Sequence, residues 1–262
     1  MDVVEAIRAE SVRFGDLVRG LAPVAPVPSC PGWTVADLSY HLAEVQDQWA
    51  RIVEGAEGDD IVSLPRPADA DLPAAFDTAS TRLVDALREA DPGTPCWSWH
   101  PQGHSVGWVL RRQAHEALIH RVDAELAAGR TPAPPSQAGL AADGVDEVLT
   151  VMLDGIPEWG TFTPDGRLVR IRGEESLVVA DLTFRLGRFR GTGPESGTQW
   201  DLTAAQSTDV GGGVDQAPGI AGPAWGLDLW LWGRGALPAD VVTDADPALV
   251  EAFRQVVADS TQ

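Results

Sequence analysis

The sequence predicts an α+β protein of two domains, a four-helix bundle over residues 1–130 and a small α+β domain over residues 139–262. Two patterns support this fold class. In the first half, apolar residues recur every three or four positions, as in helices that bury one face. In the second half, short runs alternate apolar and polar residues, as in strands. The stretch 129–137 is rich in proline, which is typical of a linker.

The first two helices are predicted at residues 2–20 and from residue 35 onward. The second has the clearer start, because Thr34 is a good N-cap and Asp37 stands at the third helical position, where it can complete a capping box. Its apolar residues follow steps of three and four and form one stripe that we expect to be buried: Val35, Leu38, Leu42, Val45, Trp49 and Ile52.

Two further helices complete the predicted bundle. The third covers about residues 70–90, where apolar residues again recur at helical spacing. The fourth begins after Ser105, which can act as its N-cap, and ends near Gly129, a residue type that favours the position after a helix. Four helices with one apolar face each imply a bundle, because each face must be covered by a neighbour.

The second domain is predicted to begin with a helix near residues 139–154 and to end with another. Residues 164–167 form a turn signal before the next strand. Asp246 and Pro247 predict the N-cap and first residue of the last helix. That helix is expected to bury Leu249, Phe253 and Val256, and two strands are predicted from the alternating runs Leu182, Phe184, Leu186 and Trp200, Leu202, Ala204.

Charge and composition exclude several classes of partner. The formal net charge of −20 repels nucleic acid and anionic membrane surfaces, and we interpret it as a solubility feature. No apolar run reaches the roughly 18 residues that span a bilayer. The acidic start is no secretory signal and the chain has only two cysteines, so we expect a cytoplasmic protein, either a monomer or a homodimer.

The histidines locate the chemistry. All five lie before residue 121, so any reaction that needs an imidazole belongs to the bundle. His115 and His120 are five residues apart, about 140° around a helix, and cannot bind one ion from one face. Glu116 and His120 are four apart, only about 40°, and point the same way.

A third ligand is available on the second helix. His41 borders the buried stripe of that helix and can point into the bundle. Together with Glu116 and His120 it would form a set of two histidines and one carboxylate, a pattern that binds zinc and leaves a position open. Iron or nickel would accept the same ligands. By spacing alone, the alternative is a packed histidine beside an exposed hydrogen-bonded pair.

Three segments resemble one family. Residues 30–42 (Cys-Pro-Gly-Trp-Thr-Val-Ala-Asp-Leu-Ser-Tyr-His-Leu) and residues 111–125 are similar to the two signatures of the DinB-like bundle of mycothiol-dependent maleylpyruvate isomerases. Residues 222–234 resemble the C-terminal α+β domain of the same family. The resemblance is collinear and covers nearly the whole chain. It implies a divalent metal, with zinc as the first choice, on the matching His41, Glu116 and His120, and mycothiol as cofactor or co-substrate.

The resemblance also implies a reaction. A metal-bound thiol loses its proton and adds to an electrophilic small molecule, either in a cis–trans isomerisation of the maleylpyruvate type or in transfer of the thiol as an S-transferase. Arg234 is the best match to a catalytic arginine of the second domain, with neutralisation of a helix C-terminus as the alternative. A metal-dependent hydrolase and a non-catalytic binding or regulatory protein remain open.

Four other residues of the motifs are expected to have lesser roles. Asp123 is a neighbour of His120 by spacing, but a solvent-facing or arginine-paired aspartate is the more common case. Arg112 is interpreted as solvated, and Cys30 as structural, because no basic residue adjoins it in the sequence. His104 is interpreted, like His115, as structural.

Overall fold

The computed structural model describes residues 1–58, 61–100, 103–153, 155–174, 181–194, 196–208 and 217–261. The chain divides into two compact units, Met1–Leu140 and Ala141–Gln262, which are treated separately below. The first is helical and the second combines a sheet with helices, so the predicted α+β class is confirmed. None of the helices in the described ranges combines the length and the apolar character needed to cross a membrane.

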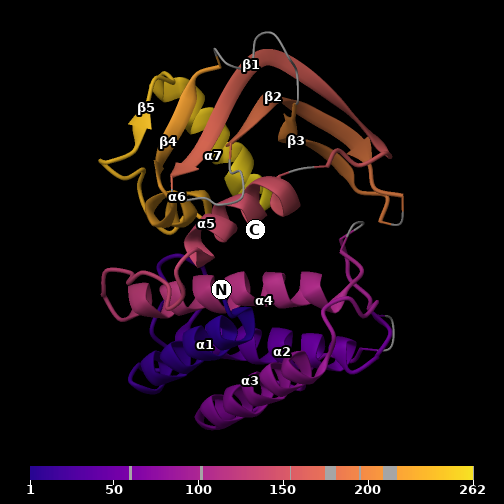
Figure 1. Cartoon of the computed structure of the whole chain (residues 1–262), viewed down its shortest axis with the longest axis vertical. Helices are drawn as coiled ribbons and strands as arrows, with labels where there is room; N and C mark the ends of the chain where they lie inside the picture. The colour runs from indigo at the N-terminus through magenta and orange to yellow at the C-terminus, as the bar shows by residue number, and fades with distance from the viewer. Residues whose placement is uncertain are drawn as a thin grey trace. The chain divides into compact units, whose positions relative to one another are not determined.

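The first unit is the predicted bundle (Figure 1). A short 3₁₀ turn precedes its third helix, and each helix packs against two others: α1 and α2 both contact α3 and α4. This places α1 diagonally across the bundle from α2. The helices are α1 (Val3–Arg19), α2 (Val35–Val53), α3 (Leu72–Glu89) and α4 (Val106–Ala127).

The helix ends follow the local sequence. Thr34 Oγ1 accepts a hydrogen bond from the Asp37 amide at 3.2 Å, and Asp37 Oδ2 accepts one from the Thr34 amide at 2.9 Å. The capping box is therefore confirmed. Ser105 caps α4 through the amide of Trp108 at 3.2 Å. Gly129 has φ +67°, a conformation that suits glycine, and lies just beyond the end of α4.

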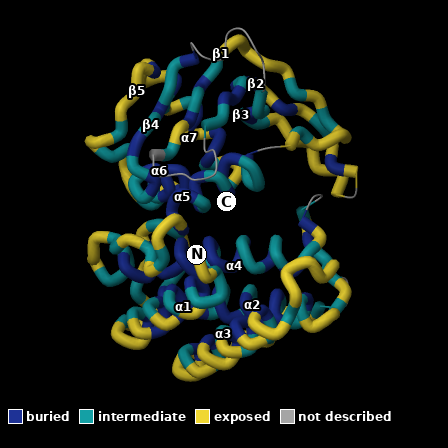
Figure 2. Tube along the Cα trace, in the orientation of Figure 1, coloured by how far each residue is buried: buried dark blue, intermediate teal, exposed yellow. Residues whose placement is uncertain are grey.

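The apolar stripes meet inside the bundle, where Figure 2 shows buried residues on the inner sides of the helices. Phe14 of α1 packs on Phe76 of α3 with ring centroids 4.8 Å apart. Of the stripe predicted for α2, only Val45 is half-buried, and the other members are buried. Val45 is thus the point at which the apolar face of α2 is least covered.

The predicted linker is held to the bundle by buried charges. Arg121, fully buried, donates to Glu10 Oε2 at 2.8 Å and to the carbonyl of Ala133 at 2.7 Å. Glu125 accepts the Ala133 amide at 2.9 Å, and Glu10 accepts the Ser136 amide at 2.6 Å. These bonds bridge α1, α4 and the Pro-rich segment, so this segment is anchored to the helices and is not a free tether.

The second unit contains a five-stranded sheet in the order β3-β2-β1-β4-β5. Neighbouring strands are antiparallel except β1 and β4, which are parallel. The predicted helix near 139–154 is found as α5 (Leu140–Glu147) with a π-helical turn after it (Val148–Met152). The strands are β1 (Gly160–Glu174), β2 (Asp181–Thr192), β3 (Gln199–Ser207), β4 (Gly219–Pro223) and β5 (Val242–Thr243).

Two helices complete this unit, α6 (Ala224–Leu231) and α7 (Pro247–Ser260). Asp246 caps α7 through the amide of Leu249 at 2.8 Å, as predicted. Phe253 of α7 packs between Phe184 of β2 and Trp230 of α6, with ring centroids 5.9 and 6.1 Å away. The three residues expected on the inner face of α7 are all buried.

The turn predicted at residues 164–167 is wrong as a strand boundary. β1 runs through it and pairs with the same partner on both sides, Pro164 with Gly187 and Leu168 with Arg185. The turn residues form a bulge, with Gly166 at φ +90°. Their chemistry is that of a turn, but the pairing with β2 resumes beyond it, a contact between strands that local sequence does not reveal.

Candidate metal centre

The structure brings the three predicted ligands together between α2 and α4. Glu116 Oε1 lies 3.2 Å from His41 Nε2 and 3.0 Å from His120 Nε2. One ligand atom of each residue lies within 4.8 Å of the others. Glu116 and His120 are one turn apart on α4, while His41 reaches them from α2. The cluster is therefore geometrically able to share one ion.

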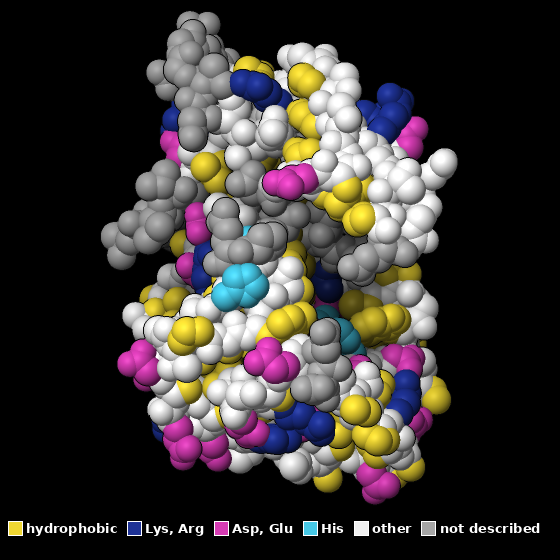
Figure 3. Space-filling view, turned by 90° about the vertical axis from the view of Figure 1, so that its right-hand side faces the viewer, with side chains coloured by type: hydrophobic (Ala, Val, Ile, Leu, Met, Phe, Trp, Pro, Cys, Tyr) yellow, Lys and Arg dark blue, Asp and Glu magenta, His cyan; other side chains and the backbone are white. Residues whose placement is uncertain are grey.

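The three side chains differ in exposure, which gives the cluster an open side. The side chains of His120 and Glu116 are 10% and 14% exposed, whereas that of His41 is 32% exposed. A small molecule approaching from solvent therefore reaches the cluster beside His41. Figure 3 shows histidine side chains on one face of the molecule, and every histidine of the sequence belongs to the helical unit.

Asp123 holds the second nitrogen of His120. Its Oδ2 lies 2.9 Å from His120 Nδ1, and its Oδ1 accepts a hydrogen bond from Ser29 Oγ at 2.6 Å. The Cys30 thiol lies 3.5 Å from the same carboxylate. Asp123 is completely buried, so the expectation of a solvent-facing aspartate is wrong. Sequence spacing identified the neighbour, but the loop that encloses it was not predictable.

Arg112 holds the other oxygen of Glu116. Its Nη2 donates to Glu116 Oε2 at 2.5 Å from one turn earlier on α4, and Arg112 is only 7% exposed. The interpretation of Arg112 as solvated is therefore wrong. With Oε2 bound to the guanidinium, Oε1 is the oxygen that faces both imidazoles.

The charges of the cluster are strongly coupled. Burial alone would raise the pKa of Glu116, but the positive charges of His120 and Arg112 hold it well below its ordinary value. Burial alone would lower the pKa of His120, but Glu116 and Asp123 outweigh it and raise the pKa to about 9. The protein by itself therefore places a positive charge beside Glu116, at the point a metal cation would occupy.

Trp33 flanks both imidazoles. Its ring centroid lies 4.9 Å from that of His41 and 6.5 Å from that of His120. The two imidazoles themselves meet edge to face at 4.8 Å. Trp33 immediately precedes the cap of α2, so the local geometry that starts the helix also sets an apolar wall beside the cluster.

The remaining histidines lie outside the cluster. His115 is fully buried but, as its spacing from His120 predicted, it is absent from the group of ligand atoms. His104 is exposed. His100 stacks on Trp108 with ring centroids 5.9 Å apart, in a loop rich in tryptophan.

Arg234 lies in the second unit, just after α6. Its Nη1 donates to the carbonyl of Trp232, the residue that caps this helix, at 2.5 Å. This contact is the one expected of an arginine that neutralises a helix C-terminus. A catalytic role of Arg234, which is half-buried, stays a prediction.

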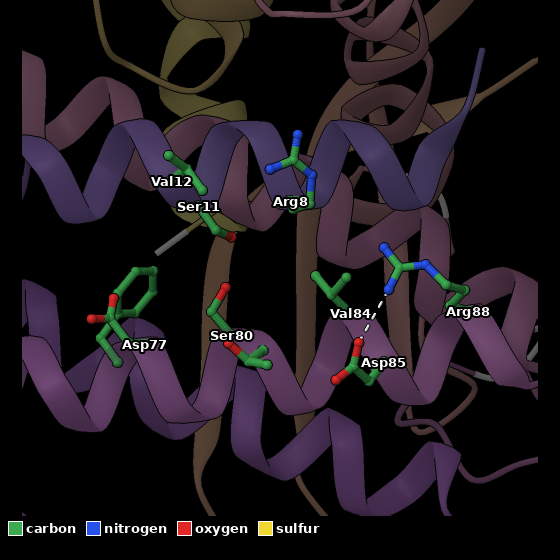
Figure 4. Close-up of a pocket in the computed structure, with 10 residues that line it drawn as sticks. Arg8, Ser11, Val12, Asp77, Ser80, Val84, Asp85 and Arg88 are labelled. Atoms are coloured by element: carbon green, nitrogen blue, oxygen red, sulfur yellow. Dashed lines mark hydrogen bonds and ion pairs between the residues drawn. The ribbon is translucent and has the colours of Figure 1, made fainter.

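A groove on the first unit does not carry the chemistry. It lies between α1 and α3, has a volume of about 270 Å³ and is drawn in Figure 4. Neither histidine nor cysteine is among its lining residues. Two of its arginines bind carboxylates on their own helices, Arg88 to Asp85 at 3.1 Å and Arg8 to Glu5. The metal cluster lies on the other side of the bundle, between α2 and α4.

Comparison with known proteins agrees with the motifs. Residues 4–125 match the family model of the mycothiol maleylpyruvate isomerase N-terminal domain. The matched residues span nearly all of the four-helix bundle. The whole chain also matches the fold of two crystal structures, that of a mycothiol-dependent maleylpyruvate isomerase and that of a histidine-to-alanine mutant of such an enzyme.

The match to these two structures concerns the fold. Sequence identity is 14% in both cases, and the TM-scores are 0.59 and 0.58. Each match covers 93% of this chain and 92% of the chain in the crystal structure. The two-domain α+β architecture is therefore shared over almost the full length. Among proteins with curated descriptions, none matches this sequence significantly.

Proposed function

We propose that the protein is a metal- and mycothiol-dependent enzyme, which activates the thiol as a thiolate for addition to an electrophilic small molecule. The outcome is either a cis–trans isomerisation of the maleylpyruvate type or transfer of the thiol. The observation that carries this proposal is the convergence of His41, Glu116 and His120 on one point. The match of residues 4–125 to the mycothiol maleylpyruvate isomerase N-terminal domain supports it.

The residues fit a divalent metal, with zinc as the first choice. Two imidazoles and one carboxylate form a set that zinc binds with a position left open. Asp123 Oδ2 lies beside Nδ1 of His120 and would hold the proton there, so Nε2, which is directed at Glu116, is the nitrogen that would give up its proton and bind the metal. Iron or nickel would accept the same donors.

The charge of the site fits a cation and one thiolate. Glu116 and Asp123 are negative and Arg112 is positive, so the pocket has a formal charge of about −1 when its histidines are neutral. A divalent metal bound there supplies Lewis acidity, which lowers the pKa of a thiol in the open position. One thiolate then brings the local charge to about zero.

The protein residues position the reactants. Trp33 and the buried walls keep water from the thiolate, and the more exposed side near His41 admits the electrophile. The thiol proton leaves to solvent, and the sulfur forms a bond to an electrophilic carbon whose π electrons move onto a conjugated carbonyl. In isomerisation the adduct rotates about the bond that was double. The carbon–sulfur bond then breaks, the double bond forms again and the thiolate is released. In transfer the carbon–sulfur bond persists.

We also propose Arg234 as a catalytic residue that binds a carboxylate of the substrate or of the thiol. The support is the resemblance of residues 222–234 to the family. Arg234→Lys should retain part of the activity and Arg234→Met should raise KM for a carboxylate-bearing substrate. An unchanged KM and kcat in both variants would leave Arg234 with the helix-capping role alone.

The proposal is tested by metal and product analysis. Purified protein should hold about one zinc per chain, and His41→Ala and His120→Ala should abolish it. His104→Ala, an exposed histidine outside the cluster, is the matched control and should keep the metal. Mass spectrometry after incubation with zinc, mycothiol and candidate electrophiles should show thiol-dependent products. Turnover without thiol would indicate a hydrolase, and no turnover with any electrophile a binding protein.

A further inference from the structure

A buried amide without a partner lies on the same helix as two of the proposed ligands. Gln113 of α4 is 1% exposed, and within the described part of the chain neither its Oε1 nor its Nε2 has a hydrogen-bond partner. Buried side-chain amides are normally paired, because each unmet donor and acceptor has lost its water. An amide with both groups unmet therefore indicates a partner that the protein chain does not supply.

Helical geometry directs Gln113 toward the metal cluster. Gln113 precedes His120 by seven residues, so their directions around the helix differ by only about 20°. It precedes Glu116 by three residues, an offset along the axis of about 4.5 Å. Side chains three residues apart are neighbours on a helix surface. Gln113 thus continues the polar face of α4 next to the cluster.

Contacts between α2 and α4 show where Gln113 lies along the axis of the bundle. His41 of α2 meets Glu116, and Trp49 of α2 meets Trp108 with ring centroids 5.7 Å apart, so α2 and α4 run antiparallel. Gln113 lies between Trp108 and Glu116 on α4. It therefore lies between the metal cluster and a pair of tryptophans, an enclosed position inside the bundle.

The other buried glutamine at this level is directed elsewhere. Gln46 of α2 is fully buried, and its Nε2 donates to Ser11 Oγ of α1 at 3.0 Å. Because α1 is diagonal to α2, Gln46 spans the bundle interior and contributes to its packing. Gln46 Oε1 has no partner in the described part of the chain, but its Nε2 is bound, whereas both groups of Gln113 are unmet there. Gln113 is therefore the amide with both groups available to a ligand.

We propose that Gln113 is a specificity-determining residue that binds an amide group of the thiol ligand. This inference rests on the proposed function, since the thiol is placed by the metal. The carboxamide of Gln113 has a donor and an acceptor, and an amide of the ligand can meet the acceptor with its N–H group or the donor with its carbonyl oxygen. A thiol with an acylated amine near its sulfur carries such an amide, whereas an ester analogue lacks the donor.

The test compares two small thiols on the cobalt-substituted protein. N-Acetylcysteamine carries a secondary amide, and 2-mercaptoethyl acetate carries an ester of the same shape. Thiolate binding is followed by the sulfur-to-cobalt charge-transfer absorption, so no turnover is needed. The wild-type protein should bind the amide thiol about tenfold more tightly, because the ester has no N–H group to donate to Gln113 Oε1.

Variants assign the preference to the residue. Gln113→Met keeps the size of the side chain and removes its polar atoms, so it should bind both thiols alike and still hold cobalt. Gln46→Met is the matched control, a second buried glutamine, and should keep the preference for the amide. If Gln113→Met does not fold, Gln113→Asn, which shortens the reach of the amide, should reduce the same preference.

The outcomes separate this inference from the proposed function. Equal affinity of the wild-type protein for both thiols, or a preference that survives in Gln113→Met, would overturn the role of Gln113 and indicate that buried water satisfies its amide. Cobalt binding with a thiolate absorption would meanwhile leave the proposed function standing. Absence of that absorption with either thiol would overturn both.

Discussion

Replacing Asp123 by asparagine tests whether a buried carboxylate tunes the metal site. Asp123 contacts no proposed position of the metal and acts only through His120, so it is a positioning residue. Its carboxylate is fully buried, lies 2.9 Å from His120 Nδ1 and accepts from Ser29 at 2.6 Å. In Asp123→Asn one of these two contacts must face an N–H group instead of an oxygen.

The expected magnitude follows from the loss of that acceptor. Carboxylates that orient a metal-bound histidine typically contribute 10- to 100-fold to metal affinity, about 1.4–2.7 kcal/mol. Ser29→Ala removes one hydrogen bond from the same carboxylate but leaves the imidazole contact, so its effect should be smaller, below about tenfold. The order of affinities should therefore be wild type, Ser29→Ala and then Asp123→Asn.

Competition with a chelator of known zinc affinity, at constant pH, measures the three dissociation constants. Urea unfolding of each metal-free variant shows how much of any loss comes from the fold, because leaving a buried partner unpaired costs about 1–3 kcal/mol by itself. If well-folded Asp123→Asn bound zinc as tightly as the wild-type protein, the positioning role argued from the 2.9 Å contact would be refuted.

Three further predictions concern metal, pH and the Pro-rich segment. Removal of metal by a chelator should lower the Tm of the wild-type protein and leave that of His41→Ala unchanged, because a ligand stabilises only the state that binds it. Hydrogen bonds from Thr34, and the charge of Arg66, lower the pKa of Asp37 to about 2, so the stability from its ionised form is complete above pH 4 and is lost as pH falls through 2. Thr34→Ala should cost about 1 kcal/mol in urea unfolding at pH 7, and less near pH 2; equal losses would contradict the capping argument. Arg121→Met should destabilise by about 3 kcal/mol, since it removes the fully buried cation from Glu10 and Glu125 and leaves them only the longer contacts of Arg13, whereas the exposed Arg254→Met should have little effect in the same assay.

Contacts between residues that are close in the sequence could be predicted from the sequence alone. The capping box of Thr34 and Asp37 and the cap of the last helix at Asp246 join residues three apart. The pairing of Glu116 with His120 follows from four residues of one helix. Each depends on backbone geometry that is the same in every helix, so residue spacing suffices to predict it.

Other features were missed because their partners are distant along the chain. Ser29 and Asp123 are separated by 94 residues, and no pattern in either segment names the other. The ion network that anchors the Pro-rich segment joins Glu10 to Ser136 across 126 residues. Composition correctly identified a segment without regular structure, but only packing decided that it is anchored.

The sequence by itself determined the four helices, the caps of α2 and α4, the linear order of a helical and an α+β part, and a carboxylate–imidazole pair on one helical face. Tertiary structure decided that His41 faces this pair, that Asp123 and Arg112 are buried against it, and that Gln113 has no partner among the described residues. The physical reason is the range of the interactions involved. Helical periodicity and capping act within one or two turns, whereas the burial of a charge or an amide depends on which distant surfaces exclude water from it.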